Sequence, residues 1–296
     1  MSGSRRSSDL PSAPKSNPGA DVPRVAALHC YPVKGCAGIS VPDAVVTPAG
    51  LAHDRGFMVV DTDGVFRSQR RDPRLALVRP RVSADGGQLT LSADGVSPVR
   101  VTVDLLAARR EVFLFGTSYR GIDQGDTAAE WLSEVLGVPS RLVRVPPEHH
   151  RVTDGRIPGT AGYADSGAVH LLSVASVTVL NERIAAWGAK PVSMGRFRPN
   201  IVVDGWREPH VEDQARRIVI GEVELGYTKL AIRCAVTMVD QDVGAKAGPE
   251  PLRTLADYRR AAQGGVAFGA KFAVLRTGKL SVGDEVTVTS RGDSEL

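Results

Sequence analysis

The feature that most constrains how this chain folds is a succession of short apolar runs, broken by turns rich in glycine and aspartate. The runs are rich in Val, Phe and Leu, as β-strands are, and Asp61-Thr62-Asp63-Gly64 is typical of a hairpin turn. Strands so closely spaced favour an antiparallel barrel or sandwich over βαβ units. The strands expected in the first half of the chain are 24–33, 57–61, 65–69, 75–82, 88–92, 99–103 and 111–115.

The second half adds helices to this strand-rich pattern. Thr127, with Glu130 three residues later, forms a capping-box pattern, and a serine and a proline open two further helices. The helices are expected from Thr127 to Gly137, from Ser173 to Gly188 and from Pro251 to Gly264. Further strands are expected at 200–203, 217–225, 230–232, 271–275 and 285–289. The sequence therefore predicts an α+β chain that is rich in β structure.

Two stretches of unusual composition suggest how the chain is divided. Residues 1–22 contain six serines and almost no apolar bulk, so we expect a disordered tail there. The polar stretch 144–167 contains Pro146-Pro147 and has no hydrophobic period, which is typical of a connection between modules. We therefore expect two domains, residues 23–145 and residues 146–290.

Charge and hydropathy argue against two classes of partner. Lys and Arg number 37 against 33 Asp and Glu, a net charge of +4, and half of this excess lies in the first 24 residues. The body of the chain is thus near neutral, which does not favour binding to nucleic acid through its phosphates. Since no apolar run approaches the roughly 18–20 residues of a membrane helix, we expect no membrane span.

The chain contains only three cysteines, Cys30, Cys36 and Cys234. An odd number without a CxxC pattern argues against a disulfide framework or a zinc ribbon. With no recognisable signal peptide, a reducing cytoplasm is the expected compartment. Arg233 would favour the thiolate of Cys234, although a buried, inert cysteine is the interpretation that the local sequence favours. HExxH, Walker A and GxGxxG patterns do not occur.

Several cations lie at expected strand ends. Lys34 precedes Gly35 at the end of one strand, Arg55 lies just before another, and Arg198 precedes Asn200 at the start of a third. Each alone is typical of a solvated strand end. Together they could form a cradle for an anion, because guanidinium groups bind phosphate in a bidentate manner and lysine adds a point charge. Their spacing in the sequence does not show that they converge.

Five segments, in this order, resemble a known family: Tyr31-Pro-Val-Lys34, Asp54-Arg55 with Phe57 to Asp61, Gln69-Arg70 with Pro73 to Leu77, Phe197 to Val202, and Arg233 to Thr237 with Val239-Asp240. They resemble MOSC proteins of the two-part type, the group of the mitochondrial amidoxime-reducing component and its bacterial relatives. The resemblance implies an N-terminal antiparallel β-barrel-like domain, followed by a MOSC β-barrel domain with a few peripheral helices.

The resemblance also implies a molybdenum–pterin cofactor (Mo-molybdopterin), with Cys234 as the thiolate ligand of the metal; pyridoxal phosphate is not expected. A soft sulfur ligand suits a metal held by the dithiolene of the pterin. Asp240 is implied as a catalytic residue that orients substrate or relays a proton, although it is also typical of a turn. The positions implied to bind the cofactor are Lys34, Gly35, Arg55, Asp165, Ser166, Arg198, Asn200 and Arg233. The positions that depart from the family pattern are Gly35, Gly167, Ile232 and Gln241.

The activity implied by the resemblance is the reduction of N-hydroxylated small molecules. An iron–sulfur cluster needs four cysteines, so we expect the electrons to come from a separate ferredoxin- or cytochrome-type protein with its reductase. A second hypothesis is a molybdenum cofactor carrier or sulfur-transfer module without turnover, because the MOSC domain also occurs in the molybdenum cofactor sulfurase. A third is a β-rich binding protein in which Cys234 is merely buried.

Overall fold

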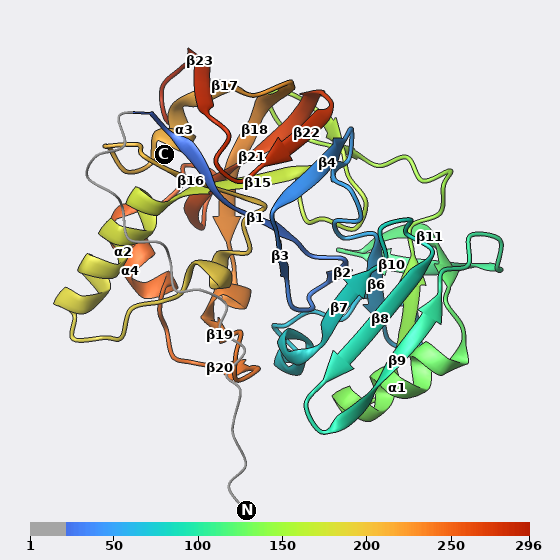
Figure 1. Cartoon of the computed structure of the whole chain (residues 1–296). Helices are drawn as coiled ribbons and strands as arrows, with labels where there is room; N and C mark the ends of the chain where they lie inside the picture. The colour runs from blue at the N-terminus through green and yellow to red at the C-terminus, as the bar shows by residue number, and fades with distance from the viewer. Residues whose placement is uncertain (1–21) are drawn as a thin grey trace, which may run out of the picture.

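The computed structural model describes residues 22–296 and confirms an α+β fold dominated by strands. An eight-stranded sheet with helices α2 and α4 forms one body, and a five-stranded sheet, the meander β7-β8-β9 and α1 form a second beside it (Figure 1). The disordered tail predicted for residues 1–22 lies, apart from Val22, outside the described residues. No helix between residues 22 and 296 is both long and apolar enough to cross a membrane.

The large sheet has the strand order β23-β17-β18-β21-β15-β16-β1-β3. Its strands are β1 (Arg24–Cys30), β3 (Ile39–Val41), β15 (Val169–Ser173), β16 (Ile201–Asp204), β17 (Ala215–Ile220), β18 (Val223–Arg233), β21 (Val266–Arg276) and β23 (Val286–Arg291). The strand pairing leaves β23 and β3 as edges, and an isolated bridge of Arg24 with Glu285 joins the start of β1 to the residue that precedes β23. Leu171, Ile218 and Phe272 belong to the apolar core that this sheet buries.

The second body contains a five-stranded sheet in the order β10-β11-β12-β6-β2 and the meander β7-β8-β9. These strands are β2 (Val33–Lys34), β6 (Phe57–Val60), β7 (Arg79–Val82), β8 (Gln88–Ala93), β9 (Val96–Thr102), β10 (Arg109–Leu114), β11 (Thr117–Asp123) and β12 (Arg141–Arg144). The smaller pairings join β4 (Asp43–Thr47) to β5 (Gly50–Leu51) and β22 (Gly278–Ser281), β13 (Val152–Thr153) to β14 (Gly159–Thr160), and β19 (Val239–Asp240) to β20 (Ala245–Lys246).

The helices are short and lie around the sheets. They are α1 (Asp126–Leu136), α2 (Val174–Ala186), α3 (Val211–Gln214) and α4 (Leu252–Tyr258), with 3₁₀ turns η1 (Pro73–Leu77), η2 (Met194–Phe197) and η3 (Ala235–Met238). Apolar residues of α2 and α4 pack with β15, β16 and β21 in a separate core that includes Leu180, Leu255 and Phe268.

The two bodies share the beginning of the chain. β1 pairs with β16, with Leu28 opposite Ile201, and β4 pairs with β22, so both belong to the body built mainly from the second half of the chain. Between β1 and β3 of the large sheet, the chain enters the five-stranded sheet at β2, which pairs in parallel with β6. The division predicted at residues 145 and 146 stays a prediction, and the site described below lies where the bodies meet.

The second half of the chain contains one βαβ unit, which the strand spacing of the first half did not indicate. β15, α2 and β16 form such a unit, because β15 and β16 pair in parallel, with Leu171 opposite Ile201. All residues of β15 are buried, so the strand lacks the alternation of a half-exposed antiparallel strand. The predicted cap of this helix is confirmed, since the Ser173 hydroxyl accepts a hydrogen bond from the Ser176 N–H at 3.1 Å.

Several predicted strands differ from the structure because turns lie within apolar runs. Residues 217–225 form a hairpin between β17 and β18 that turns at Gly221, whose φ is 55°. The expected strand 75–82 begins in η1, and the expected strand 65–69 makes only isolated bridges. The turn predicted before residue 65 is confirmed, because the Asp61 N–H donates to the Val65 carbonyl at 2.9 Å. A local run of apolar residues does not show whether long-range pairing continues along it.

Two predicted helix boundaries also move. α1 has Gly125, not Thr127, at its N-cap and no side-chain cap, while its predicted stop at Gly137 is confirmed by a left-handed φ of 73°. α4 ends at Tyr258, well before Gly264, because Arg260 leaves the helix to bridge Val266.

Truncating Leu180 tests the packing of the βαβ unit. Leu180 is fully buried between α2 and the sheet, so Leu180→Ala is expected to lower the free energy of unfolding by about 2–5 kcal/mol. Thr178 is exposed on the same helix, and Thr178→Ala is expected to change the free energy of unfolding by less than about 0.5 kcal/mol. Urea denaturation of both variants measures the difference, and equal losses would contradict the packing described here.

Candidate functional site

A pocket of about 260 Å³ lies where the two bodies meet. Its walls come from β2 and from loops of the second body on one side, and from residues after η2 and at the end of β18 on the other. The structure therefore brings together residues that are far apart in the sequence. The predicted site residues that line it are Lys34, Gly35, Arg55, Asp165, Ser166, Arg198, Asn200, Arg233 and Cys234.

Cys234 is the one cysteine whose thiol reaches this pocket. It directly follows β18, and its carbonyl accepts the Thr237 N–H at 3.0 Å in the first turn of η3. Cys234 is exposed, whereas Cys30 and Cys36 are buried, and burial raises the pKa of Cys36 to about 12. The expectation that Cys234 is a buried cysteine is therefore wrong.

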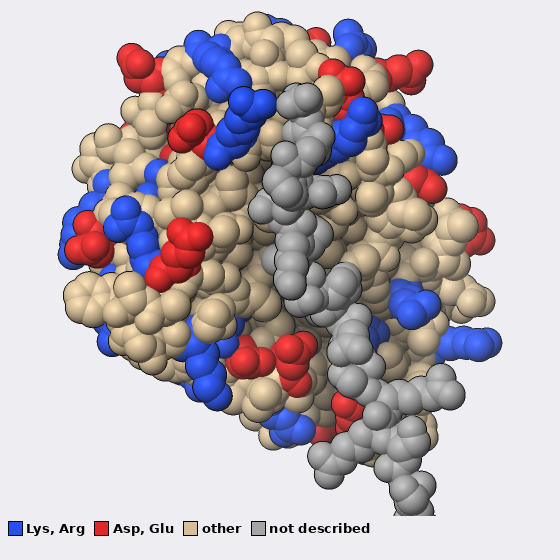
Figure 2. Space-filling model, turned by 60° about the vertical axis from the view of Figure 1, so that its left-hand side comes forward, with Lys and Arg blue, Asp and Glu red and all other residues tan. Residues whose placement is uncertain are grey.

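The pocket concentrates positive charge. Seven cationic side chains line it against one carboxylate, that of Asp165; the cations are Lys34, Arg55, Arg67, Arg70, Arg198, Arg233 and Lys271. On the face shown in Figure 2, by contrast, basic and acidic side chains are interspersed. Arg198 Nη2 and Arg233 Nε are buried there without a hydrogen-bond partner. Because buried donors normally have partners, these two groups indicate an anionic ligand.

Two of the arginines are held by an unusual stack on Tyr31. The Arg55 and Arg198 guanidinium carbons lie 4.3 and 4.2 Å from the centroid of its ring. Both arginines have left-handed backbones, with φ values of 47° and 55°. A bulky residue at positive φ is strained, and such strain tends to occur at functional sites. The backbone therefore contributes directly to placing these two charges.

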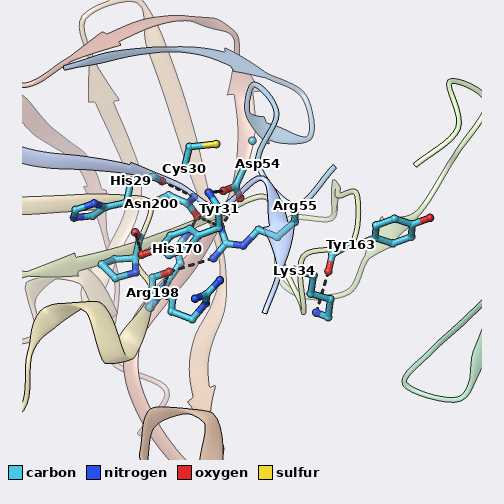
Figure 3. Close-up of polar contacts among 12 residues, drawn as sticks. His29, Cys30, Tyr31, Lys34, Asp54, Arg55, Tyr163, His170, Arg198 and Asn200 are labelled. Atoms are coloured by element: carbon cyan, nitrogen blue, oxygen red, sulfur yellow. Dashed lines mark hydrogen bonds and ion pairs between the residues drawn. The ribbon is translucent and has the colours of Figure 1, made fainter. Parts of the chain in front are cut away.

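Buried polar partners fix the orientation of Arg55 (Figure 3). Its guanidinium donates to the Asp54 carboxylate, to Asn200 Oδ1 at 3.0 Å and to the Arg198 carbonyl at 3.2 Å. Asp54 also accepts the Tyr31 N–H at 2.8 Å, and the Asn200 amide donates to the His29 carbonyl at 3.1 Å. Asn200, which is 1% exposed, thus ties β1 to the segment before β16 rather than presenting a free amide to the pocket.

Lys34 is buried, not a solvated strand end. Its ammonium donates to the Tyr163 carbonyl at 2.9 Å and forms an ion pair with Asp165 (Figure 3 shows the former contact). Burial lowers the pKa of Lys34, while attraction to Asp165 opposes this shift. The Asp165 side chain is 63% exposed, so the carboxylate remains reachable from the pocket.

Two groups of pocket residues are not among the site residues expected from the sequence. Lys271 lies on β21, and burial, followed by repulsion from Arg233 and Arg55, lowers the pKa of Lys271 to about 7. A lysine within the apolar run 266–275 was a usable signal. The second group is the loop 66–70, which overlaps the strand expected at 65–69 and contains the motif Gln69-Arg70.

Asp240 does not line the pocket. Its carboxylate pairs with Arg196 at 3.2 Å and accepts the N–H groups of Asp242 and Val243 at 3.0 and 3.2 Å. These contacts are those of a turn residue. The catalytic role of Asp240 stays a prediction.

Comparisons with known proteins agree with this arrangement. Residues 22–139 match the MOSC N-terminal beta barrel domain, and residues 158–287 match the MOSC domain. The rat protein named mitochondrial amidoxime reducing component 2 is 35% identical over 284 residues, which cover 88% of this chain and 82% of the rat protein. Human mitochondrial amidoxime-reducing component 1 is 34% identical with the same coverage of both chains.

A second kind of relative is much longer than this chain. The zebrafish protein named molybdenum cofactor sulfurase is 32% identical over 264 residues, which are 83% of this chain and 31% of the sulfurase. The resemblance found in the sequence is confirmed by both domain matches and by these relatives. The chain therefore belongs to the MOSC-domain family, in the group that carries a MOSC N-terminal β-barrel domain before the MOSC domain.

Proposed function

We propose that this protein is a molybdenum-cofactor-dependent reductase of N-hydroxylated compounds, of the amidoxime or hydroxylamine type. The observation that carries the proposal is the exposed thiol of Cys234 in a pocket lined by seven cations. The relatives named amidoxime-reducing components, which match along most of their length, support the same activity.

The donor set of the pocket suits the molybdenum–pterin cofactor. Cys234 would supply a soft sulfur ligand, and a thiol that coordinates a metal is deprotonated. The unpartnered guanidinium nitrogens of Arg198 and Arg233, together with Lys271, would bind the phosphate of the cofactor. Gly35 lines the pocket at a φ of 81°, and its backbone N–H group would serve where a hydroxyl side chain is absent.

When bound, the cofactor supplies a metal that exchanges two electrons with the substrate. Conversion of an N–OH group to N–H consumes two electrons and two protons and releases one water. The residues of this chain would bind and orient: Arg233 and Lys271 hold negative charge, and Lys34 holds Asp165 at the wall of the pocket. Asp165 and Ser166 would accept hydrogen bonds from the substrate or the pterin. Asp240, whose carboxylate pairs with Arg196, lies outside the lining of the pocket.

The electrons would come from a separate ferredoxin- or cytochrome-type protein with its reductase. A cluster held by this chain would need four cysteines, and Cys30 and Cys36 are buried. Among residues 22–296 no group of His, Cys, Asp and Glu side chains is arranged to hold a metal ion. The reducing cytoplasm stays the expected compartment, because an odd number of cysteines without a CxxC pattern argues against a disulfide framework.

Replacing Cys234 with serine tests the metal ligand. Protein from molybdenum-replete cells is assayed for amidoxime reduction with a reduced viologen dye as electron donor. Cys234→Ser is expected to lose activity by at least about 100-fold, because hydroxyl replaces the soft ligand. Its melting temperature should stay unchanged, since the side chain is exposed. Cys30→Ala, a buried cysteine outside the pocket lining, should keep most of the activity.

Full activity in Cys234→Ser would overturn the assignment of the ligand. Molybdenum and pterin bound to the parent protein, with no reduction of amidoximes by any competent donor, would favour instead a cofactor carrier or sulfur-transfer module. The similarity to the protein named molybdenum cofactor sulfurase supports this alternative. Parent protein that contains neither metal nor pterin would contradict both.

The anion cradle is tested by the retention of the cofactor. Arg233→Gln removes a cation whose buried Nε has no partner, so the variant is expected to bind the cofactor roughly tenfold more weakly. The molybdenum-to-protein ratio after gel filtration measures this loss. Arg217→Gln, on the exposed side of β17, is the matched control and should retain the parent ratio. Equal retention in both variants would show that Arg233 does not bind the cofactor.

A further inference from the structure

Two aromatic side chains form a part of the pocket wall beside the cations of the anion cradle. The rings of Phe66 and Phe115 meet edge to face, with centroids 4.8 Å apart and an interplanar angle of 65°. Both residues line the pocket, and Phe115 is 50% exposed. They come from the loop after the Asp61 turn and from the hairpin between β10 and β11.

The backbone of Phe115 is unfavourable for a phenylalanine. Phe115 and Gly116 are the two loop residues between paired Leu114 and Thr117, and both have positive φ, 54° and 82°. Two positive φ values in a two-residue hairpin define a turn that favours Asn-Gly or Gly-Gly. A bulky aromatic residue in this conformation is an outlier, and half of its surface remains exposed. Local folding preference therefore does not explain Phe115, and strain of this kind points to a functional role.

Lys34 connects the aromatic pair to the charged side of the pocket. Its ammonium lies 5.0 Å from the Phe115 centroid and 5.4 Å from the Phe66 centroid, within the range of cation–π attraction. The same ammonium is fixed by Asp165 and by the Tyr163 carbonyl. The edge of the pocket thus has a rigid aromatic surface, and Ile232, 43% exposed, adds apolar surface to the lining.

The charged and aromatic parts of the lining suit different ligands. Cations bind the anionic groups of a cofactor, and apolar rings gain most by covering an uncharged, planar group. We propose that Phe66 and Phe115 form an aromatic wall that selects substrates in which a planar aromatic ring carries the N-hydroxylated group. This inference rests on the proposed function and adds a specificity-determining element to it.

The test compares two substrates that share one reacting group. The parent and Phe115→Asn are assayed with an aromatic amidoxime and with a small aliphatic amidoxime. Asparagine suits the turn, so the melting temperature should stay within about 3 °C of the parent. We expect kcat/KM for the aromatic substrate to fall about tenfold, mainly through KM, and that for the aliphatic substrate by less than about twofold.

Two further variants separate the wall from general effects. Phe115→Tyr keeps the ring and should keep the preference for the aromatic substrate. Leu106→Asn removes an apolar side chain that is 90% exposed and does not line the pocket, and it should change neither rate. An equal fall for both substrates in Phe115→Asn would overturn the proposal. Loss of molybdenum or pterin from that variant would also overturn it, because the ring would then contact the cofactor.

Failure of the proposed function can be recognised separately. If the parent reduces neither substrate, the reductase assignment fails, and binding alone then tests the wall. Saturation-transfer NMR with the two amidoximes should show a signal for the aromatic compound that is lost in Phe115→Asn and kept in Phe115→Tyr. Signals that are identical in the parent and in Phe115→Asn would overturn the proposal of an aromatic wall.

Discussion

The structure depends on holding like charges close together in one pocket. Seven cations face a single lining carboxylate, and their mutual repulsion has to be offset by the rest of the fold. The electrostatic cost appears in the pKa values of two side chains. Burial, followed by repulsion from neighbouring arginines, lowers the pKa of Lys271 to about 7. Burial lowers the pKa of Arg233 to about 10. An anion bound in the pocket would relieve this repulsion.

The fold offsets the repulsion with a buried scaffold behind the pocket. Asp54, Tyr31 and Asn200 hold Arg55, and the Tyr31 ring lies within 4.3 Å of both the Arg55 and the Arg198 guanidinium carbons. This scaffold requires β1 to lie beside β16, since Asn200 donates to the backbone of His29. The site therefore forms only when β1, the first strand of the chain, joins the large sheet that is built mainly from the second half of the chain.

The sequence predicted the strand-rich class, the turn at Asp61 and the cap at Ser173 because these depend on neighbouring residues. It did not show that Lys34 and Arg198 line one pocket, since Lys34 lies in the five-stranded sheet and Arg198 lies before β16. Their chemistry suggested a shared anion cradle, and only the resemblance to a family gave that cradle a ligand, the molybdenum–pterin cofactor. The hairpin at Gly221 and the parallel pairing of β15 with β16 were missed because buried strands have no alternation that marks pairing or direction. Lys271 and the aromatic pair were missed because strand register and turn conformation decide where they point.

The central claim is that the sulfur of Cys234 binds a metal in this pocket. X-ray absorption spectroscopy at the molybdenum edge, on the parent protein and on Cys234→Ser with equal metal content, measures the sulfur neighbours of the metal directly. We predict one more sulfur neighbour in the parent than in the variant. The same number of sulfur neighbours in both samples would contradict the claim.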